Sequence, residues 1–314
     1  MKAKIFIDGA AGTTGLEIRE RLKPRSELDV LQLAEADRKD PRARAKALNA
    51  ADIVVLCLPD AAAKEAVALI DNPAVRVIDA SCAHRVASGW IYGFPELEPG
   101  RADEIAAAKR VSNPGCYPTG FLSLVRPLTR AGLIPADFPL TVNAVSGYSG
   151  GGRKMIAEFE DKAAPCETVV RAYALNLAHK HAPEMQVHAR LDHPPVFAPG
   201  VGRFYRGMLV EVPLQLWALP TSPSPEAIYE TLAEAYRGQP LVTVVPLPEA
   251  AAMKSLDAER MRGTNRLELY VFANGETGQV RLAAVFDNLG KGASGAAVQN
   301  LNIMLGLPQT TGLE

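Results

Sequence analysis

A glycine-rich turn near the amino terminus constrains the fold more than any other feature of this chain. Residues 4–8 are apolar enough for a buried strand, and residues 14–22 have the pattern of a helix. The turn between them has the spacing GxxGxxG and comprises Gly9, Gly12, Thr13, Thr14 and Gly15. Glycines let the backbone approach a pyrophosphate, and the free N–H groups at the helix start bind its oxygens. The turn therefore predicts a dinucleotide site in a βαβ unit, with a structural tight turn as the alternative.

The rest of the amino-terminal part alternates between strand and helix patterns, as in a parallel sheet with crossover helices. The run IVVLCL at 53–58 is apolar throughout, as expected of a strand buried on both faces. The expected strands and helices lie at 4–8, 14–22, 29–34, 41–50, 53–58, 61–70 and 76–78. We therefore expect a doubly wound, Rossmann-type α/β domain over residues 1–115.

The pattern changes in the second part of the chain, where several β-type runs have few helices between them. After a helix at 119–131, the expected strands lie at 140–145, 168–177, 204–216, 241–245, 267–273 and 279–285. This favours an α+β catalytic domain with a largely antiparallel sheet over residues 116–292. The apolar residues of 293–305 recur at helical spacing, and we expect segment 293–314 to return to the first domain.

Composition and charge exclude several classes of function. In 314 residues, 34 Lys and Arg balance 35 Asp and Glu, so no general field attracts nucleic acid or an anionic membrane. The amino terminus lacks a signal-peptide pattern, and no apolar stretch is long enough to span a bilayer. The four cysteines have no CxxC spacing, which argues against a structural metal site or a disulfide framework. We expect a cytoplasmic protein whose partner is a small molecule.

The identity of the dinucleotide depends on a charged loop that follows the glycine turn. Glu35 stands where an acid would bind the ribose hydroxyls of NAD. Arg38 and Lys39 follow in the same loop and could bind the 2′-phosphate of NADP. The two signals disagree, and a third interpretation makes all three residues solvated loop charges.

Cys116 is the candidate nucleophile. It follows a Pro-Gly turn after a short predicted strand and stands at the start of a helix. The helix dipole and unpaired N–H groups favour a thiolate there, and the same N–H groups can form an oxyanion site. Cys57 lies inside an apolar strand and is expected to be a small buried hydrophobe, whereas nothing in the sequence gives Cys82 or Cys166 a function.

His179 and His181 form the second candidate for chemistry. Because they alternate, both side chains would face the same way in an extended segment, just before a helix that Pro183 would open. The pair suits general acid–base catalysis, a structural role, or half of a metal site. No third ligand follows at a recognised spacing, so we expect no metal. The remaining histidines are expected to be ordinary polar residues, namely His84, His188 and His193.

Five blocks of the sequence occur in the same order as in one known family. They are YGFPEL at 92–97, SNPGCYPT at 112–119, SGYSGGGR at 146–153, HKHAPE at 179–184 and DNLGKGASGAAVQN at 287–300. Together they resemble the N-acetyl-γ-glutamyl-phosphate reductases, which are related to aspartate-semialdehyde dehydrogenase, and the chain is similar to the shorter of that family's two length variants. One segment departs from the pattern: residues 79–85 are DASCAHR, where the family usually has DLSADFR.

The resemblance implies an NADPH-dependent enzyme of arginine biosynthesis that reduces N-acetyl-L-glutamyl 5-phosphate to N-acetyl-L-glutamate 5-semialdehyde and phosphate. It implies a thioester on Cys116, a homo-oligomer, proton transfer by His179 or His181, and a cofactor contact at Asn288. The residues that it places at the substrate are Arg85, Ser112, Asn113, Arg153, Glu184 and Lys291. For the phosphate we favour Arg153, because the glycine-rich run before it lets an anion approach closely.

Two other functions stay open on the sequence alone. An aspartate-semialdehyde dehydrogenase-like enzyme would share the cysteine and the glycine turn but bind its carboxylate differently, and the HKHAPE block argues against it. A non-catalytic dinucleotide-sensing protein would need the glycine turn but no activated thiol. Within the histidine pair we favour His181 as the acid–base group, because the positive end of the following helix would ease its proton exchange.

Overall fold

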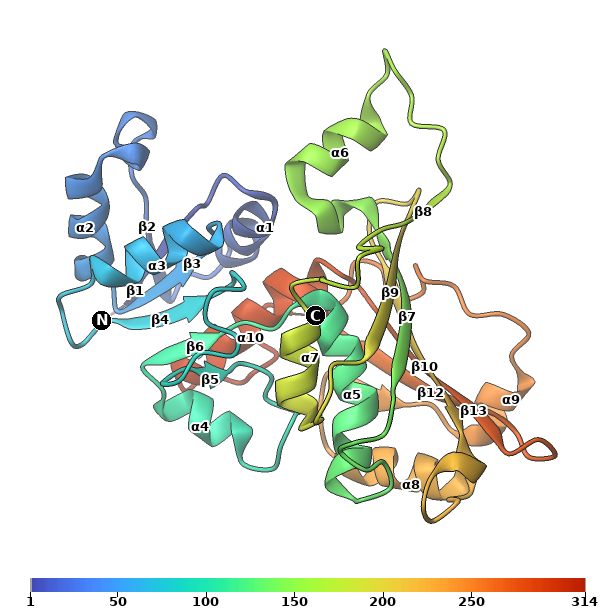
Figure 1. The fold of residues 1–314 in the computed structure, drawn as a ribbon. Coiled ribbons are helices and arrows are strands. Elements are labelled where there is room, and N and C mark those ends of the chain that lie inside the picture. Colours follow the sequence, from blue (N-terminus) through green and yellow to red (C-terminus); the bar gives the residue numbers. More distant parts are fainter. Residues whose placement is uncertain (1, 314) are drawn as a thin grey trace. The chain divides into compact units, whose positions relative to one another are not determined.

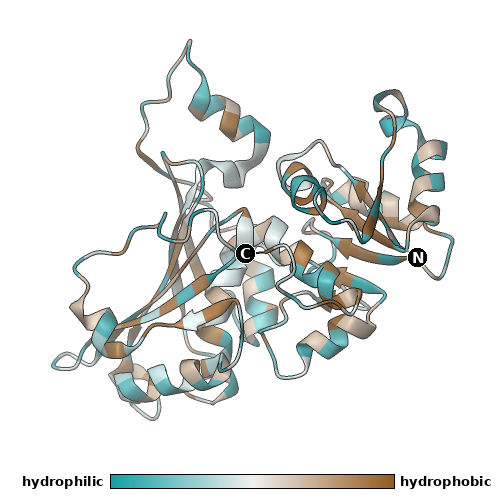
Figure 2. Ribbon diagram, turned by 180° about the vertical axis from the view of Figure 1, so that it is seen from behind, coloured by the Kyte–Doolittle hydropathy of each residue, from teal (hydrophilic) through white to brown (hydrophobic). Residues whose placement is uncertain are grey.

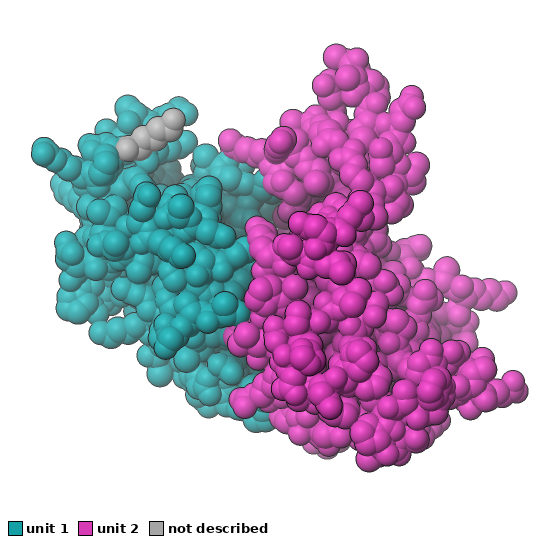
Figure 3. Space-filling view, in the orientation of Figure 1, with its two compact units in different colours: residues 1–115, 293–314 teal, residues 116–292 magenta. Residues whose placement is uncertain are grey.

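A computed structural model describes residues 2–313 of the chain (Figure 1). The chain folds into two compact units, one of residues 1–115 and 293–314 and the other of residues 116–292 (Figure 3). Each unit has its own sheet, and the strands of the first unit are mostly hydrophobic (Figure 2). None of the helices within residues 2–313 is long and apolar enough to cross a membrane.

The first unit is built on a six-stranded sheet in the order β2-β1-β3-β4-β6-β5, and every neighbouring pair is parallel. Its strands are β1 (Ala3–Asp8), β2 (Leu28–Leu31), β3 (Ile53–Leu56), β4 (Arg76–Asp79), β5 (Ile91–Tyr92) and β6 (Arg110–Ser112). Its helices are α1 (Thr13–Leu22), the 3-10 helix η1 (Glu35–Lys39), α2 (Pro41–Ala50), α3 (Asp60–Ala68), α4 (Arg101–Ala107) and α10 (Gly295–Met304). The strand order reverses at β1, and ligands of such sheets bind where the order reverses. The predicted doubly wound α/β fold is confirmed.

Local sequence explains how the first unit is assembled. All four residues of β3 are buried, because helices cover both faces of the sheet at its centre. Asp40 caps α2 by accepting a hydrogen bond from the N–H of Arg42 at 3.0 Å. The helix α10 is buried along its whole length and packs against α1, α4 and β4. Arg76 of β4 ties this packing together by donating to the carbonyls of Ala106 and Met304.

The second unit contains a seven-stranded sheet in the order β11-β12-β13-β10-β7-β9-β8. Four of its pairings are antiparallel and two are parallel, so the prediction of a largely antiparallel sheet is confirmed. The strands are β7 (Thr141–Gly147), β8 (Val170–Ala172), β9 (Val196–Gly202), β10 (Met208–Gln215), β11 (Val242–Val244), β12 (Leu267–Asn274) and β13 (Gln279–Phe286). The helices are α5 (Cys116–Arg130), η2 (Tyr148–Gly151), α6 (Gly152–Glu160), α7 (Ala182–Ala189), η3 (Leu216–Ala218), α8 (Pro225–Ala235), α9 (Leu247–Ala252) and the π-helical turn η4 (Gly290–Ser294).

Helix α5 is the buried axis of the second unit. It packs against β10, β13, α7 and α8, and its residues 117–128 are all buried. Gly120 permits this close approach, since a Cβ at that position would lie 2.7 Å from Cγ2 of Val210. The helix begins at Cys116, three residues earlier than predicted, which places the cysteine in its first turn.

Two expected strands of the second unit are shorter than predicted, and one strand was missed. Only Val170–Ala172 of the expected strand 168–177 forms β8, and β10 begins at Met208 although a strand was expected from residue 204. The missed strand β9 contains Pro199 and two glycines, residue types that are depleted in strands. It forms because it pairs along its whole length with β7.

Candidate functional site

Cys116 lies in a confined place at the start of α5. Its side chain is partly buried, and Gly292 faces it so closely that a Cβ on Gly292 would lie 3.0 Å from the Cβ of Cys116. The N–H groups of the first helical turn have no carbonyl partner within the helix. A thiolate here lies at the positive end of the helix dipole, which also favours negative charge on the oxygen of a reacting group.

Two tyrosines connect the cysteine to the rest of the second unit. The hydroxyl of Tyr117 donates to the carbonyl of Gly200, and the hydroxyl of Tyr173 donates to the hydroxyl of Tyr117, both at 3.1 Å. Burial raises the pKa of Tyr173 to about 12; the hydrogen bond to Tyr117 opposes this rise and the charge of Cys116 adds to it. Burial also raises the pKa of Tyr117 well above its usual value. Both hydroxyls therefore stay protonated at neutral pH and act as fixed dipoles beside the thiol.

His179 and His181 lie beside these tyrosines. The two imidazole rings are 4.7 Å apart, and their centroids lie 6.0 Å and 5.9 Å from the ring of Tyr117. His179 also meets the rings of Tyr173 and Phe197 edge-on, at 5.6 Å and 5.1 Å. The structure thus gathers both predicted histidines around Tyr117, the residue that follows Cys116 in α5.

The expectation of an extended histidine segment is wrong. His181 has helical backbone angles and occupies the N-cap of α7, and the N–H of Ala182 donates to the carbonyl of His179 at 2.9 Å. This hydrogen bond closes a turn that starts α7 at Ala182, one residue before the proline. Both rings still face Tyr117 because the turn folds them onto the same side.

The hydrogen bonding of His179 fixes its tautomer. The N–H of His181 donates to Nδ1 of His179 at 3.1 Å, so Nδ1 is an acceptor. Burial, with a smaller contribution from the charge of Lys180, lowers the pKa of His179 to about 4. The ring is therefore neutral at pH 7 and carries its proton on Nε2. It can donate a hydrogen bond there, but it does not take up and release a proton near neutral pH.

Three of the predicted substrate residues belong to the first unit and are buried there. Arg85 donates through Nε to the carbonyl of Asn113 at 2.9 Å, and Asn113 donates to the carbonyl of Ala293 at 3.0 Å. Ser112 is fully buried at the end of β6. In the departing segment, His84 makes a 2.6 Å contact with the buried carboxylate of Asp79, a pairing that the family's usual phenylalanine could not make.

The other predicted residues belong to the second unit and differ in exposure. Glu184 and Lys291 expose only 2% and 1% of their surface, whereas Arg153 at the start of α6 is exposed. Asn288 accepts from the N–H of Gly207 at 2.9 Å and donates to Ser149 at 3.0 Å, so it supports the glycine-rich η2 turn. Within residues 2–313, no group of three or more His, Cys, Asp or Glu side chains could hold a metal ion.

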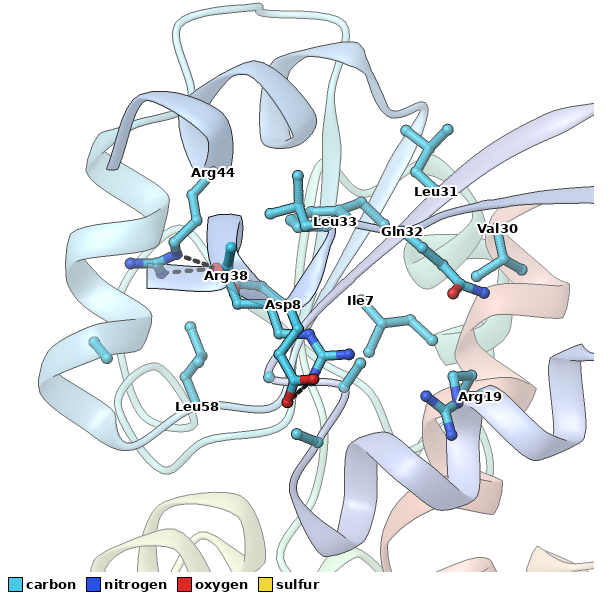
Figure 4. A pocket seen from close by; sticks show the side chains of 17 residues that line it. Ile7, Asp8, Arg19, Val30, Leu31, Gln32, Leu33, Arg38, Arg44 and Leu58 are labelled. Carbon is cyan, nitrogen blue, oxygen red and sulfur yellow. Dashed lines mark hydrogen bonds and ion pairs between the residues drawn. The ribbon is translucent and has the colours of Figure 1, made fainter. Parts of the chain in front are cut away.

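A separate cavity of about 590 Å³ lies over the glycine turn of the first unit (Figure 4). The turn needs two of its glycines for steric reasons. Gly9 has a φ of +89°, and a Cβ there would lie 2.3 Å from the carbonyl oxygen of Cys57, while a Cβ on Gly15 would lie 2.4 Å from the carbonyl oxygen of Gly9. Gly12 has space for a Cβ. Because the turn has no side chains at these glycines, a pyrophosphate can approach its backbone closely. Thr13 and Thr14 form the first turn of α1, which follows directly.

Charged side chains line the same cavity. Arg38 is half-exposed, and the largely exposed Glu35 lies 3.9 Å from it. The side chain of Lys39 lies outside the described part of the structure. Sequence reasoning missed three further charged residues of the lining, namely Asp8, Arg19 and Arg44. Asp8 carried a usable signal, since it is an acid directly before the first glycine of the turn.

Each of the two units matches a known protein family model. Residues 4–105 match the family model described as "Semialdehyde dehydrogenase, NAD binding domain", and residues 116–288 match "Semialdehyde dehydrogenase, dimerisation domain". The chain is 55% identical to the N-acetyl-γ-glutamyl-phosphate reductase of Burkholderia ambifaria, over 96% of each chain. The chain belongs to the N-acetyl-γ-glutamyl-phosphate reductase family. Other relatives are reductases 2 of Pseudomonas putida, 55% identical over 98% of each chain, and of a Nostoc species, 51% identical over 99% of each.

Solved structures of aspartate-semialdehyde dehydrogenases share the fold of the reductase family. The Vibrio cholerae enzyme II, solved with ASA, gives a TM-score of 0.71 at 15% identity, over 97% of this chain and 98% of that one. The Candida albicans enzyme, solved with NADP, gives 0.68 at 13% identity, over 97% and 99%. The predicted family membership, the fold class, an oxidoreductase activity and a nicotinamide-dinucleotide-binding first unit are therefore confirmed.

Proposed function

We propose that this chain reduces N-acetyl-L-glutamyl 5-phosphate to N-acetyl-L-glutamate 5-semialdehyde and phosphate, with NADPH as reductant, as a step of arginine biosynthesis. The relatives at about 55% identity carry the name of this activity over nearly their full length. The observation that supports the mechanism is the packing of His179 and His181 against Tyr117, which follows Cys116 in the first turn of α5. A dinucleotide-sensing protein has no use for such a cluster.

Cys116 forms the covalent intermediate. Its thiolate attacks the acyl carbon of the substrate, the bond from that carbon to the phosphate oxygen breaks, and phosphate leaves with the bonding electrons. The positive end of the α5 dipole stabilises the negative carbonyl oxygen during the attack. A thioester on Cys116 remains. NADPH, held by the glycine turn of the first unit, would supply the hydride that reduces this thioester to a thiohemiacetal.

The two histidines divide the work on the oxygen of that intermediate. His179 is neutral and donates a hydrogen bond from Nε2, which stabilises negative charge on the oxygen without transferring the proton. His181 carries the proton transfer that accompanies formation and collapse of the thiohemiacetal. Collapse breaks the C–S bond, releases the semialdehyde and returns the thiolate of Cys116. The neutral state of His179 supports the choice of His181 as the acid–base group.

The remaining predicted residues take binding roles in this proposal. Arg85, Arg153 and Lys291 are the cations for the substrate phosphate, and burial makes Arg85 and Lys291 better ordered than the exposed Arg153. Ser112, Asn113 and Glu184 contact the substrate, and Asn288 contacts the cofactor. In the first unit, the glycine turn holds the pyrophosphate of NADPH, and Arg38 is one of the cations of the cavity that attract its 2′-phosphate.

We also propose that the enzyme works as a homo-oligomer in the cytoplasm. Residues 116–288 match a dimerisation domain, and large apolar side chains are exposed on this unit, among them Val170, Leu175 and Leu177. The four cysteines are free, which suits a reducing compartment.

A substrate panel tests the proposal directly. The purified protein is assayed for phosphate-dependent reduction of NADP with N-acetylglutamate semialdehyde and, separately, with aspartate semialdehyde. We expect turnover with the first aldehyde and at least about a hundredfold lower kcat/KM with the second. Aspartate semialdehyde lacks the N-acetyl group, so the buried polar groups that would bind it are left unpaired. Preference for aspartate semialdehyde would reassign the substrate, and no turnover with either aldehyde would contradict the enzyme proposal.

A further inference from the structure

The cavity over the glycine turn contains a largely buried ion pair. Asp8 ends β1 directly before Gly9, and Arg44 extends toward it from α2 (Figure 4). Nη2 of Arg44 donates to Oδ2 of Asp8 at 2.7 Å, and Nε of Arg44 donates to the same oxygen at 3.3 Å. The two side chains expose only 8% and 16% of their surfaces, yet both line the cavity.

This ion pair is better suited to positioning than to stability. Removing two charges from water costs free energy that their attraction offsets only in part, so a buried pair is weak evidence for stabilisation. Two hydrogen bonds to one carboxylate oxygen restrict the plane of the Arg44 guanidinium, and neither of them uses Nη1. Arg44 is thus a cation whose orientation is set before any ligand binds.

The other cations of the cavity are less ordered. The side chains of Arg19 and Arg38 expose 35% and 45% of their surfaces, and each lies near an exposed glutamate. An exposed arginine loses more side-chain entropy when it binds a ligand, and water screens its charge. A phosphate group in this cavity therefore gains more from Arg44 than from Arg19 or Arg38.

We propose that Arg44, held by Asp8, binds the 2′-phosphate of NADPH and is the main residue by which this protein distinguishes NADPH from NADH. The inference rests on the proposed function only in taking NADPH as the cofactor. A phosphate dianion matches the fork of a guanidinium group, whose remaining N–H groups bind its oxygens. The apolar lining by Leu33, Leu58 and Ala62 suits the adenine ring next to it. Asp8 acts through Arg44 and is a positioning residue.

Binding of adenine nucleotides to the full-length protein, measured by calorimetry, tests the assignment without relying on turnover. The probes are adenosine 2′,5′-bisphosphate and AMP, which differ only in the 2′-phosphate. We expect Arg44→Gln to weaken the bisphosphate by at least about tenfold, or about 1.4 kcal/mol, and AMP by less than about twofold. Arg42→Gln is the matched control, because Arg42 is exposed on the same helix and lies outside the cavity lining.

Two further variants separate positioning from charge. Arg44→Lys keeps the charge but cannot bridge Asp8 and a phosphate through one planar group, so we expect an intermediate loss of bisphosphate affinity. Asp8→Asn removes a negative charge, which by itself would tighten anion binding. If Asp8 positions Arg44, the Asp8→Asn variant instead binds the bisphosphate more weakly than wild type. The double variant Asp8→Asn with Arg44→Gln then binds the bisphosphate no more weakly than Arg44→Gln alone.

The outcomes distinguish this inference from the proposed function. Equal losses of bisphosphate and AMP affinity in Arg44→Gln would assign Arg44 to the general support of the cavity and overturn the inference. Unchanged or tighter bisphosphate binding in Asp8→Asn would overturn the positioning role. Failure of the wild-type protein to bind NADPH would contradict the proposed function itself. Melting temperatures without ligand, compared with Arg42→Gln, identify any variant that loses affinity by unfolding.

Discussion

The four thiols of this chain differ because of where the fold places them. Burial, with the negative charges of Asp79 and Asp8, raises the pKa of Cys57 to about 12, so this thiol is protonated and unreactive. Cys116 stands at the positive end of α5 beside two protonated tyrosines. The surroundings of Cys116 therefore suit the nucleophile of the proposed mechanism, whereas those of Cys57 suit a packing residue.

Replacing the nucleophile separates chemistry from cofactor binding. Cys116→Ser should lower the reductase rate by several orders of magnitude, because an alcohol is far less ionised than a thiol at neutral pH. NADPH affinity should stay within about twofold of wild type, since the glycine turn is unchanged. Steady-state rates and fluorescence titration measure the two effects, and Cys82→Ser serves as the control. A Cys116→Ser variant that keeps more than about a tenth of the rate would rule out the covalent thioester.

The histidine pair predicts two different pH responses. A pKa of about 4 means that His179 loses its proton as the pH rises above about 4 and stays neutral through the assay range. His179→Asn should therefore lower kcat without moving either limb of the pH profile between pH 6 and 9. His181→Asn should lower kcat and remove one limb, because it removes the group that exchanges the proton. Profiles of kcat against pH for both variants decide the matter, and loss of a limb in His179→Asn alone would exchange the two roles.

At the level of elements, the sequence predicted those parts that depend on local pattern. The strands β1 to β4 of the first unit and the glycine turn follow from apolar runs and turn residues that stand next to each other in the chain. The strand β9 and the pairing of Asp8 with Arg44 could not be predicted in this way. The first exists only through its register with β7, and the second joins residues 36 positions apart. Tyr173 reaches Tyr117 across 56 positions.

Two glycines of the turn, Gly9 and Gly15, are required by the fold, whereas we assign Gly12 to the ligand. Gly9→Ala should destabilise the protein by at least about 2 kcal/mol, because it combines a positive φ with a Cβ at 2.3 Å from a backbone oxygen. Gly12 has a φ of −73° and space for a Cβ, so Gly12→Ala should leave the melting temperature within a few degrees of wild type while weakening NADPH binding. Thermal unfolding and NADPH titration test both variants. Equal destabilisation would show that the turn is purely structural.

For the whole molecule, the second unit has an apolar surface next to the residues of the proposed mechanism. Leu175 and Leu177 expose 80% and 61% of their surfaces, and they line a groove of about 390 Å³ on the sheet together with Val170 and Leu209. The segment between β8 and α7 carries these leucines and also Tyr173 and His179. In a single copy of the chain, the apolar side chains of this segment are exposed to water. A second copy that covers it would stabilise the segment that holds both rings near Cys116.

The double variant Leu175→Asp with Leu177→Asp tests this dependence on assembly. Burying a leucine contributes about 1.5–3 kcal/mol, so loss of two of them should weaken self-association by roughly a hundredfold or more. Sedimentation velocity over a range of concentrations measures the association, and Val86→Asp is the control because Val86 is 50% exposed but lies in the first unit. We expect kcat of the leucine variant to fall as the protein is diluted and the oligomer dissociates, while NADPH affinity stays constant, because the glycine turn belongs to the other unit. An unchanged association constant would show that the partner contacts a different surface. Dissociation without loss of kcat would show that the segment holds Tyr173 and His179 without help from a second copy.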